Sequence, residues 1–228
     1  MTLGILLPTR GRPDNLDRFL RAVKDSAGDS HVYLRLDNDD PEAPMYDKVL
    51  NLHGDNNVSV YHGDRVGFGP SLNELAAHAE GHGISHLGMF GDDVVPMSLD
   101  WDLGLVAALN NRLGVSFGDD GLRKKHAPDL PTHYVTQTEV YRRLGYLSPP
   151  GFKHLFLDNV ARDIGRALKN FVFVPVRIRH MHPWAEGEHL HDTTYAEGGR
   201  NPEIRKADAA AYSRWASKHR EWKRALGV

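Results

Sequence analysis

Cysteine is absent from this chain of 228 residues. The protein can therefore form no disulfide and no metal site with thiolate ligands. Long apolar runs are also absent. None approaches the roughly 18 residues of a membrane-spanning helix, and the chain does not open with the charged and apolar regions of a secretory signal. These absences predict a protein that spans no membrane and works in the cytoplasm.

The chain also has little net charge, −2, which does not indicate a dedicated nucleic-acid binder. The charge is unevenly distributed, because residues 196–228 contain eight basic and four acidic residues. This excess of four positive charges leaves −6 on the rest of the chain. A solvated helix face explains the basic segment, and an anionic partner is the alternative explanation.

The first strand is also not followed by either of the common glycine-rich phosphate-binding motifs. The sequence there has neither the G-x-G-x-x-G of dinucleotide-binding folds nor the G-x-x-x-x-G-K-[ST] of P-loop proteins. Instead, the strand expected at 3–7 runs into Pro8-Thr9-Arg10-Gly11-Arg12. Side chains or a metal would therefore have to neutralise a bound phosphate. Arg10 and Arg12 are suited to pair with a diphosphate or to stack on a base. A turn with two solvated arginines is the alternative.

What is present is the composition of one soluble globular domain, with 40% hydrophobic and 25% charged residues. Apolar strand-like runs alternate with helical periodicity throughout the first half. Strands are expected at 3–7, 32–36, 58–61 and 86–90, and helices after Pro13, over 42–50 and from the cap Ser71 onward. This alternation predicts an α/β fold, a Rossmann-like, mostly parallel twisted sheet with helices on both faces.

The second half is less regular. Strands are expected at 113–117, 132–136 and 171–179, and helices at 139–144 and 158–168. The Gly-rich, polar segment 185–202 has no clear period and is interpreted as a lid. Near the C-terminus a stripe at helical spacing predicts a terminal helix that packs on the body; it consists of Tyr212, Trp215, His219, Trp222 and Leu226.

The most informative feature is the pair Asp92-Asp93, which follows the apolar strand 86–90. Two carboxylates at the end of a buried strand are costly unless positive charge lies beside them, and a divalent cation is the simplest source. Neighbouring side chains on an extended segment point in opposite directions. One aspartate is therefore expected to bind the metal directly, and the other through water or by contacting a sugar. A pair of surface turn residues is the alternative.

Other acidic residues follow strands as well. Asp37 and Asp39 end the strand 32–36 and can accept hydrogen bonds from a ribose or a base. The alternative is an Asx-rich turn in which Asp39 and Asp40 cap the next helix. The pair Asp119-Asp120 is interpreted as a plain turn.

Histidines and one further carboxylate complete the set. His180 and His182 alternate on a strand, face the same side and can supply nitrogen ligands to a Mn²⁺-like ion. His189 and His191 could do likewise, although a lone histidine is usually structural. Asp158 begins a helix, where the dipole favours a carboxylate. Its functional interpretation is a general base for an acceptor hydroxyl.

Together these residues resemble a GT-A-fold glycosyltransferase of the family-2 type over residues 3–195. The Pro-Ser/Thr-x-x-Arg turn of that family matches residues 8–12, its D-x-D-type motif falls at Gly91-Asp92-Asp93, and Gly replaces its first Asp. The stretches 180–183 and 192–195 also resemble small bacteriophage-encoded enzymes of this kind. The resemblance assigns donor binding to Pro8, Thr9, Arg10, Arg12, Asp37, Asp39, Arg65, Gly67, Ser71, Asn73 and Asp92.

The resemblance further implies a UDP-sugar donor and one Mn²⁺ or Mg²⁺ ion bound with the diphosphate. Asp93, His180 and His182 would be the metal ligands, and Asp158 the base of an inverting transfer. Residues 1–112 would form the nucleotide-sugar half, 113–195 the acceptor and catalytic half, and 196–228 a basic amphipathic region. Modified DNA, a virion protein and a glycan all remain open as acceptors.

Three other functions fit parts of the pattern. A metal-dependent phosphoesterase or nuclease would use a two-metal site built from Asp92, Asp93, His180, His182, His189 and His191. A non-catalytic nucleotide-sugar-binding domain would use the same fold without the chemistry. A sugar-nucleotide nucleotidyltransferase would be expected to carry a glycine-rich phosphate loop, which the N-terminus lacks.

Overall fold

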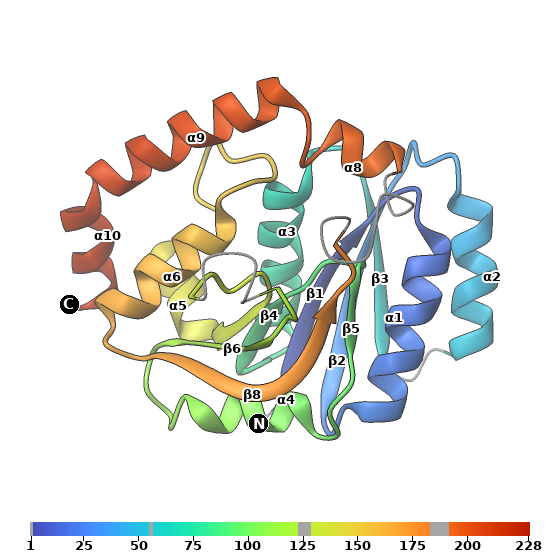
Figure 1. Cartoon of the computed structure of the whole chain (residues 1–228), viewed down its shortest axis with the longest axis horizontal. Helices are drawn as coiled ribbons and strands as arrows, with labels where there is room; N and C mark the ends of the chain where they lie inside the picture. The colour runs from blue at the N-terminus through green and yellow to red at the C-terminus, as the bar shows by residue number, and fades with distance from the viewer. Residues whose placement is uncertain (1, 55–56, 123–128, 183–191) are drawn as a thin grey trace.

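A computed structural model describes residues 2–54, 57–122, 129–182 and 192–228. Its centre is a sheet of eight strands in the order β3-β2-β1-β4-β7-β6-β8-β5, with helices on both faces (Figure 1). The prediction of a mostly parallel α/β sheet is confirmed. Among the described residues no helix is long and apolar enough to cross a membrane.

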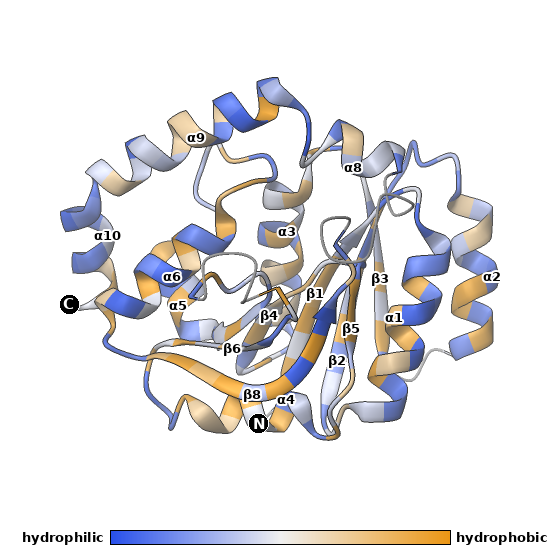
Figure 2. Ribbon diagram, viewed as in Figure 1, coloured by the Kyte–Doolittle hydropathy of each residue, from blue (hydrophilic) through white to orange (hydrophobic). Residues whose placement is uncertain are grey.

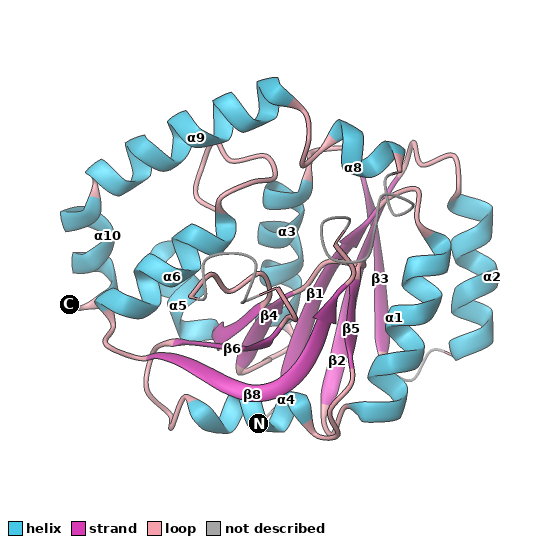
Figure 3. Cartoon of the chain, viewed as in Figure 1, coloured by secondary structure: helices cyan, strands magenta, loops and turns pink. Residues whose placement is uncertain are grey.

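The first half builds the parallel part of the sheet (Figure 3). β1 pairs in parallel with β2 and β4, and β2 pairs in parallel with β3. Three helices connect these strands. The bounds are β1 (Leu3–Thr9), α1 (Pro13–Ser26), β2 (Ser30–Asp37), α2 (Ala43–His53), β3 (Val58–Gly63), α3 (Phe68–Gly81) and β4 (His86–Met89).

The second half adds the antiparallel pairs and one further parallel pair, β6 with β8. β7 runs antiparallel to both β4 and β6, and the short β5 runs antiparallel to β8. The bounds are β5 (Val94–Pro96), α4 (Trp101–Ala108), β6 (Val115–Asp119), β7 (Tyr134–Gln137), α5 (Thr138–Leu144), α6 (Leu157–Ala167), β8 (Phe171–His180), α8 (Thr193–Glu197), α9 (Pro202–Ser217) and α10 (His219–Leu226).

The core has two parts, one on each face of the sheet. On β1, Leu6 packs with the cluster that includes α3 and α6, whereas Ile5 and Leu7 pack with the cluster that includes α1 and α4. Successive side chains of a strand point to opposite faces, so a central strand covered on both sides must be apolar throughout. Figure 2 shows this hydrophobic centre with polar outer helix faces.

Two helix boundaries differ from the sequence-based expectation. Ser71 is not the cap of α3, which begins at Phe68 after Gly67. Gly67 has a φ of 92°, and the hydroxyl of Ser71 donates to the Gly67 carbonyl from inside the first turn. Pro70 is tolerated there because the first-turn N–H groups have no helical partner. The segment 68–70, which precedes the expected cap, is therefore helical. The helix expected over 42–50 begins at Ala43 and continues to His53.

The C-terminal stripe packs on the body as predicted, but from two helices instead of one. The helical conformation is interrupted at Lys218, between α9 and α10. The rings of Trp215 and Trp222 stack at 4.9 Å within the cluster of α3 and α6, and Leu226 joins them. His219 is exposed, because the break turns it away from this face.

Part of the expected lid, residues 185–202, lies outside the described residues. His189 and His191 are in that part. Its described part is not irregular: α8 covers Thr193–Glu197, and Pro202 begins α9. Asp192 caps α8 by accepting a hydrogen bond from the backbone N–H of Tyr195. In Figure 1 this segment lies beside the carboxyl ends of β1 and β2.

Candidate active site

A cleft of about 830 Å³ opens at the carboxyl ends of β1, β2 and β4. Open α/β sheets bind ligands at this edge. Both halves of the chain contribute to its walls, since the segments 153–159 and 194–205 lie opposite the first strands. The following predicted site residues line it: Pro8, Thr9, Arg10, Arg12, Asp37, Arg65, Gly67, Ser71, Asp92, Asp93, Asp158, His180 and His182.

Arg12 joins the turn after β1 to both Asp92 and Asp192. Its Nη1 donates to Asp92 Oδ1 at 3.0 Å, while Nε and Nη2 grip the two oxygens of Asp192 at 2.6 and 2.8 Å. Thr9 Oγ1 donates to the second oxygen of Asp92 at 2.6 Å. Burial raises the pKa of Asp92, and the Arg12 charge opposes this shift. Arg12 thus connects the Asp92 carboxylate with the start of α8.

Asp93 faces His180 because β5 pairs with β8 and brings Val94 opposite His180. His180 Nε2 lies 3.3 Å from Asp93 Oδ2. Burial alone would raise the pKa of Asp93, but His180 and Arg12 outweigh it and hold this pKa below its usual range. The two aspartates therefore face different partners, as expected for neighbours on an extended segment, although they lie in the turn between β4 and β5.

These groups fit a divalent cation. Asp93 supplies a carboxylate beside the imidazole of His180, whose Nδ1 is buried and has no hydrogen-bond partner among the described residues. The ring of His182 lies 5.3 Å from that of His180 and hydrogen-bonds the hydroxyl of Tyr195. Mg²⁺ and Mn²⁺ take few protein ligands when a substrate diphosphate supplies the others. No preformed group of three or more such ligands occurs in the described ranges.

The carboxylate of Asp37 lies between two arginines. Arg35 Nη1 donates to its Oδ1 at 2.5 Å, and Arg10 Nη1 lies 3.3 Å from Oδ2. Arg35 is only 3% exposed and also binds Glu74. Sequence reasoning missed Arg35 as a site residue, and its signal was a single charge inside the apolar run 32–36.

Two of the predicted donor-binding residues do not line the cleft. Asp39 is 60% exposed and pairs with Arg10 from outside. Asn73 ties α3 to the loop at Leu147 and Ser148: its Oδ1 accepts both backbone N–H groups, and its Nδ2 donates to the Ser148 carbonyl. Its contacts are therefore structural.

The turn interpretation holds in part for Asp40 and for Asp120, but neither Asp39 nor Asp40 caps α2, whose N-cap residue is Glu42 without a side-chain hydrogen bond. Asp40 accepts hydrogen bonds from the backbone N–H groups of Gly11 and Glu42. Asp120 is nearly buried, accepts from Leu122 N and Thr132 Oγ1, and also lines the cleft. It is thus a turn residue that contributes a carboxylate to the site.

Asp158 lies in the first turn of α6 and lines the cleft. Its Oδ1 accepts the backbone N–H of Asn159 at 2.8 Å. Burial raises the pKa of Asp158 and outweighs this hydrogen bond. The residue before the helix, Phe156, has a φ of 66°, so the chain turns sharply into α6. A partly buried carboxyl with a raised pKa at a cleft wall is a candidate for a general base.

Glycosyltransferases are among the solved structures that this chain resembles. S. aureus TarS (residues 1–349) in complex with UDP-GlcNAc superposes with a TM-score of 0.55 and 13% identity, over 79% of this chain and 60% of that one. The mannosyltransferase PcManGT from Pyrobaculum calidifontis, in complex with GDP-Man and Mn²⁺, gives a TM-score of 0.64 and 13% identity, over 82% and 59%.

The chain thus spans about three fifths of the length of these two proteins. No family model matches the sequence, and no curated protein matches it. The similarity concerns the arrangement of strands and helices: the chain has the GT-A fold of these glycosyltransferases.

Proposed function

We propose that this protein is a glycosyltransferase that moves a sugar from a nucleotide-sugar donor to an acceptor hydroxyl. One observation carries the proposal: the turn 8–12, Asp37, the pair Asp92-Asp93 and Asp158 all line one cleft, although they are far apart in sequence. The fold supports it, because solved neighbours hold UDP-GlcNAc or GDP-Man.

The donor end of the cleft is assigned to the first half of the chain. Asp37, oriented by Arg10 and Arg35, accepts hydrogen bonds from the base or ribose of a UDP-sugar. Asp93 and His180, with His182 beside them, are the residues that would hold one Mn²⁺ or Mg²⁺ ion. When bound, the ion neutralises the leaving diphosphate. Arg12 and Thr9 orient Asp92 toward the donor.

Asp158 is assigned as the base at the acceptor side. The acceptor oxygen attacks the anomeric carbon, the bond from that carbon to the diphosphate oxygen breaks, and the nucleoside diphosphate leaves with the electron pair. The hydroxyl proton passes to the Asp158 carboxylate. Attack opposite the leaving group inverts the anomeric centre.

We also propose a role for each part of the chain and a location for the protein. Residues 1–112 form the nucleotide-sugar-binding half, residues 113–195 the acceptor and catalytic half, and residues 196–228 a basic amphipathic helical region. We propose a cytoplasmic location, because we expect the nucleotide-sugar donor in the cytoplasm. Modified DNA, a virion protein and a glycan are the acceptor classes considered.

The first experiment is a calorimetric titration of UDP, with GDP as control, in Mn²⁺ and then in EDTA. We expect micromolar UDP binding that needs the metal and rejects GDP. The Asp93→Ala variant should weaken this binding at least tenfold, an estimate of about the size seen when groups that support a metal site are removed. Binding of neither nucleotide under any condition would contradict the proposal.

A further inference from the structure

Some of the cations that line the cleft form no ion pair with a carboxylate. Among the described residues, seven Arg and Lys side chains line it. Four of them form ion pairs with neighbouring carboxylates, namely Arg10, Arg12, Arg35 and Arg65. The other three, Lys153, Arg200 and Arg205, pair with no carboxylate in the described part of the chain. These three residues are called the cationic wall below.

The cationic wall is built by one buried carboxylate. Asp208 of α9 is fully buried and accepts the backbone N–H groups of Lys153, His154 and Leu155 at 2.8, 2.9 and 2.7 Å. Arg205 lies on the same helix, one turn before Asp208. The Asp208 contacts therefore fix the backbone of Lys153 to the helix that carries Arg205, and both residues line the cleft.

Arg200, the third cation of the wall, lies on the same side of the cleft as Lys153. The His154 ring lies so close to Gly198 that a Cβ there would meet it at 3.1 Å. Arg200 follows two residues later, with its guanidinium carbon 5.9 Å from the centre of the Tyr195 ring. The loop at 153–154 and the segment between α8 and α9 thus meet at one side of the cleft.

Helix ends add to the positive potential. α3, α6 and α9 each begin with residues that line the cleft, so their N-termini, which carry the positive ends of the helix dipoles, lie at its walls. Lys153 lies between two of these starts. Its carbonyl accepts the backbone N–H of Gly69 near the start of α3, and five residues later the chain reaches Asp158 in α6.

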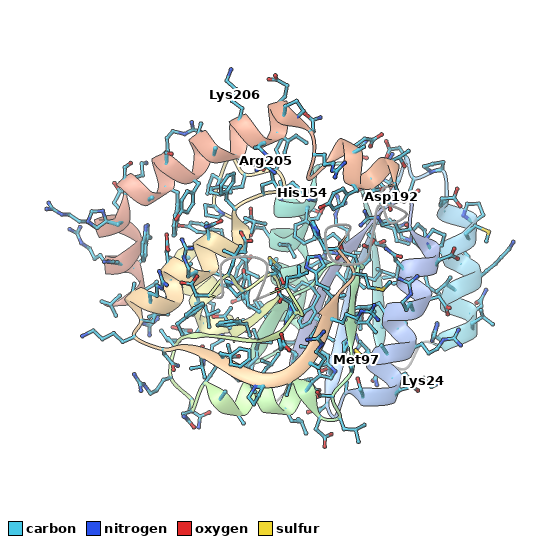
Figure 4. All side chains as sticks on the ribbon, viewed as in Figure 1. Lys24, Met97, His154, Asp192, Arg205 and Lys206 are labelled. Atoms are coloured by element: carbon cyan, nitrogen blue, oxygen red, sulfur yellow. The ribbon has the colours of Figure 1, made fainter. Side chains whose placement is uncertain are left out.

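We propose that the cationic wall binds the phosphate of a phosphorylated acceptor and so presents a nearby hydroxyl to Asp158. This inference rests on the proposed function, and it names the acceptor class. Because Lys153, Arg200 and Arg205 line the same cleft as Asp158, we assign the wall to a small phosphorylated acceptor and not to a polyanion. On α9, Figure 4 shows Lys206 on the outer side of the helix and Arg205 on the side of the body.

The test uses the full chain saturated with UDP and Mn²⁺, so that the donor site is filled. Glucose 6-phosphate is titrated by ligand-observed NMR, with glucose as the uncharged control. We expect glucose 6-phosphate to bind, inorganic phosphate to displace it and glucose to bind at least tenfold more weakly. Arg205→Gln and Lys153→Gln should each weaken binding about tenfold, which corresponds to the loss of one charge-assisted hydrogen bond.

Lys206→Gln is the matched control, since it removes the same charge from the next residue of α9 and should change nothing. Two results would overturn the inference: UDP binding that persists while no phosphate ligand binds, or UDP affinity that falls in Arg205→Gln and Lys153→Gln as much as phosphate affinity does. The second result would assign the wall to the donor diphosphate.

A short single-stranded oligonucleotide forms the other arm of the test. If it binds more tightly than glucose 6-phosphate and Lys206→Gln weakens it as much as Arg205→Gln does, the partner is nucleic acid along α9, and the inference is wrong. Repeating the phosphate titration without nucleotide separates the two proposals. Phosphate binding without UDP binding would retain the anion site and reject the donor assignment.

Discussion

Arg12 holds two carboxylates that lie 100 residues apart in the sequence, Asp92 and Asp192. A guanidinium can do this because its planar fork offers several donors in fixed directions, which a lysine lacks. Asp93, next in sequence to Asp92, instead faces the imidazole of His180. At the scale of single residues, the site therefore separates its two adjacent aspartates by giving each its own contact partner.

Asp158 provides the sharpest test at this scale. Asp158→Asn keeps the shape of the side chain and an oxygen that can accept the Asn159 N–H, but it removes the base. We expect the transfer rate to fall by a factor of about 10² to 10⁴, the usual contribution of general base catalysis. UDP affinity measured by calorimetry should remain nearly unchanged. Turnover like that of the wild type would reject Asp158 as the base.

The same substitution also has a predicted effect on stability. Burial raises the pKa of Asp158 in the folded chain above its usual value. The folded state therefore binds more protons than the unfolded state between these two values, and the penalty for ionising Asp158 grows as the pH rises through that window. At neutral pH, Asp158→Asn should unfold at a higher urea concentration than the wild type.

At a pH well below the usual aspartate pKa of about 3.9, Asp158 is protonated in both folded and unfolded chains, and this difference should disappear. Urea unfolding curves of both proteins across the acid range measure it. A variant less stable than the wild type at neutral pH would mean that the dipole of α6 stabilises the ionised carboxylate more than burial destabilises it.

At the scale of elements, α9 is joined to the cleft through Asp208. Replacing Asp208 with Ala would leave three backbone N–H groups of residues 153–155 without their acceptor, at a cost of about 1–3 kcal/mol for each one that water cannot reach. We expect Asp208→Ala to lower the free energy of unfolding by roughly 3 kcal/mol in total. Asp208→Asn, which keeps one acceptor oxygen, should lose less. Equal losses in the two variants would show that packing, not hydrogen bonding, holds α9 there.

The helices and strands show how much of the fold could be predicted from the sequence alone. The alternation of apolar strands and amphipathic helices predicted the parallel part of the sheet, because β1 and α1 show their periods clearly. The start of α3 was missed because Gly67 and Pro70 favour loops as well as helix ends. The break at Lys218 was missed because Trp215 and Trp222 remain in phase with a single helix.

Site residues follow the same logic. A carboxylate directly after an apolar strand, such as Asp92, can be recognised in the sequence, because a charge at the end of a buried strand needs a functional or structural partner. The pairing of Arg12 with Asp192, the burial of Arg35 beside Asp37 and the grip of Asp208 on residues 153–155 have no local pattern. These contacts depend on how distant segments meet, and only the fold supplies that information.

At the scale of the whole molecule, the cleft joins both halves of the chain, so a ligand that bridges its walls should stabilise the entire fold. A ligand at about 100 times its dissociation constant adds about 2.7 kcal/mol to the stability of the state that binds it. For a chain of this length, that corresponds to a rise in Tm of about 5–10 °C. We therefore expect UDP with Mn²⁺ to raise the Tm by this amount in differential scanning calorimetry. UDP in EDTA should produce little shift, and GDP with Mn²⁺ serves as the control for non-specific nucleotide effects. If UDP raises one unfolding transition while a second, separate transition stays constant, the nucleotide stabilises only one half of the chain, and the bridging role of the cleft is wrong.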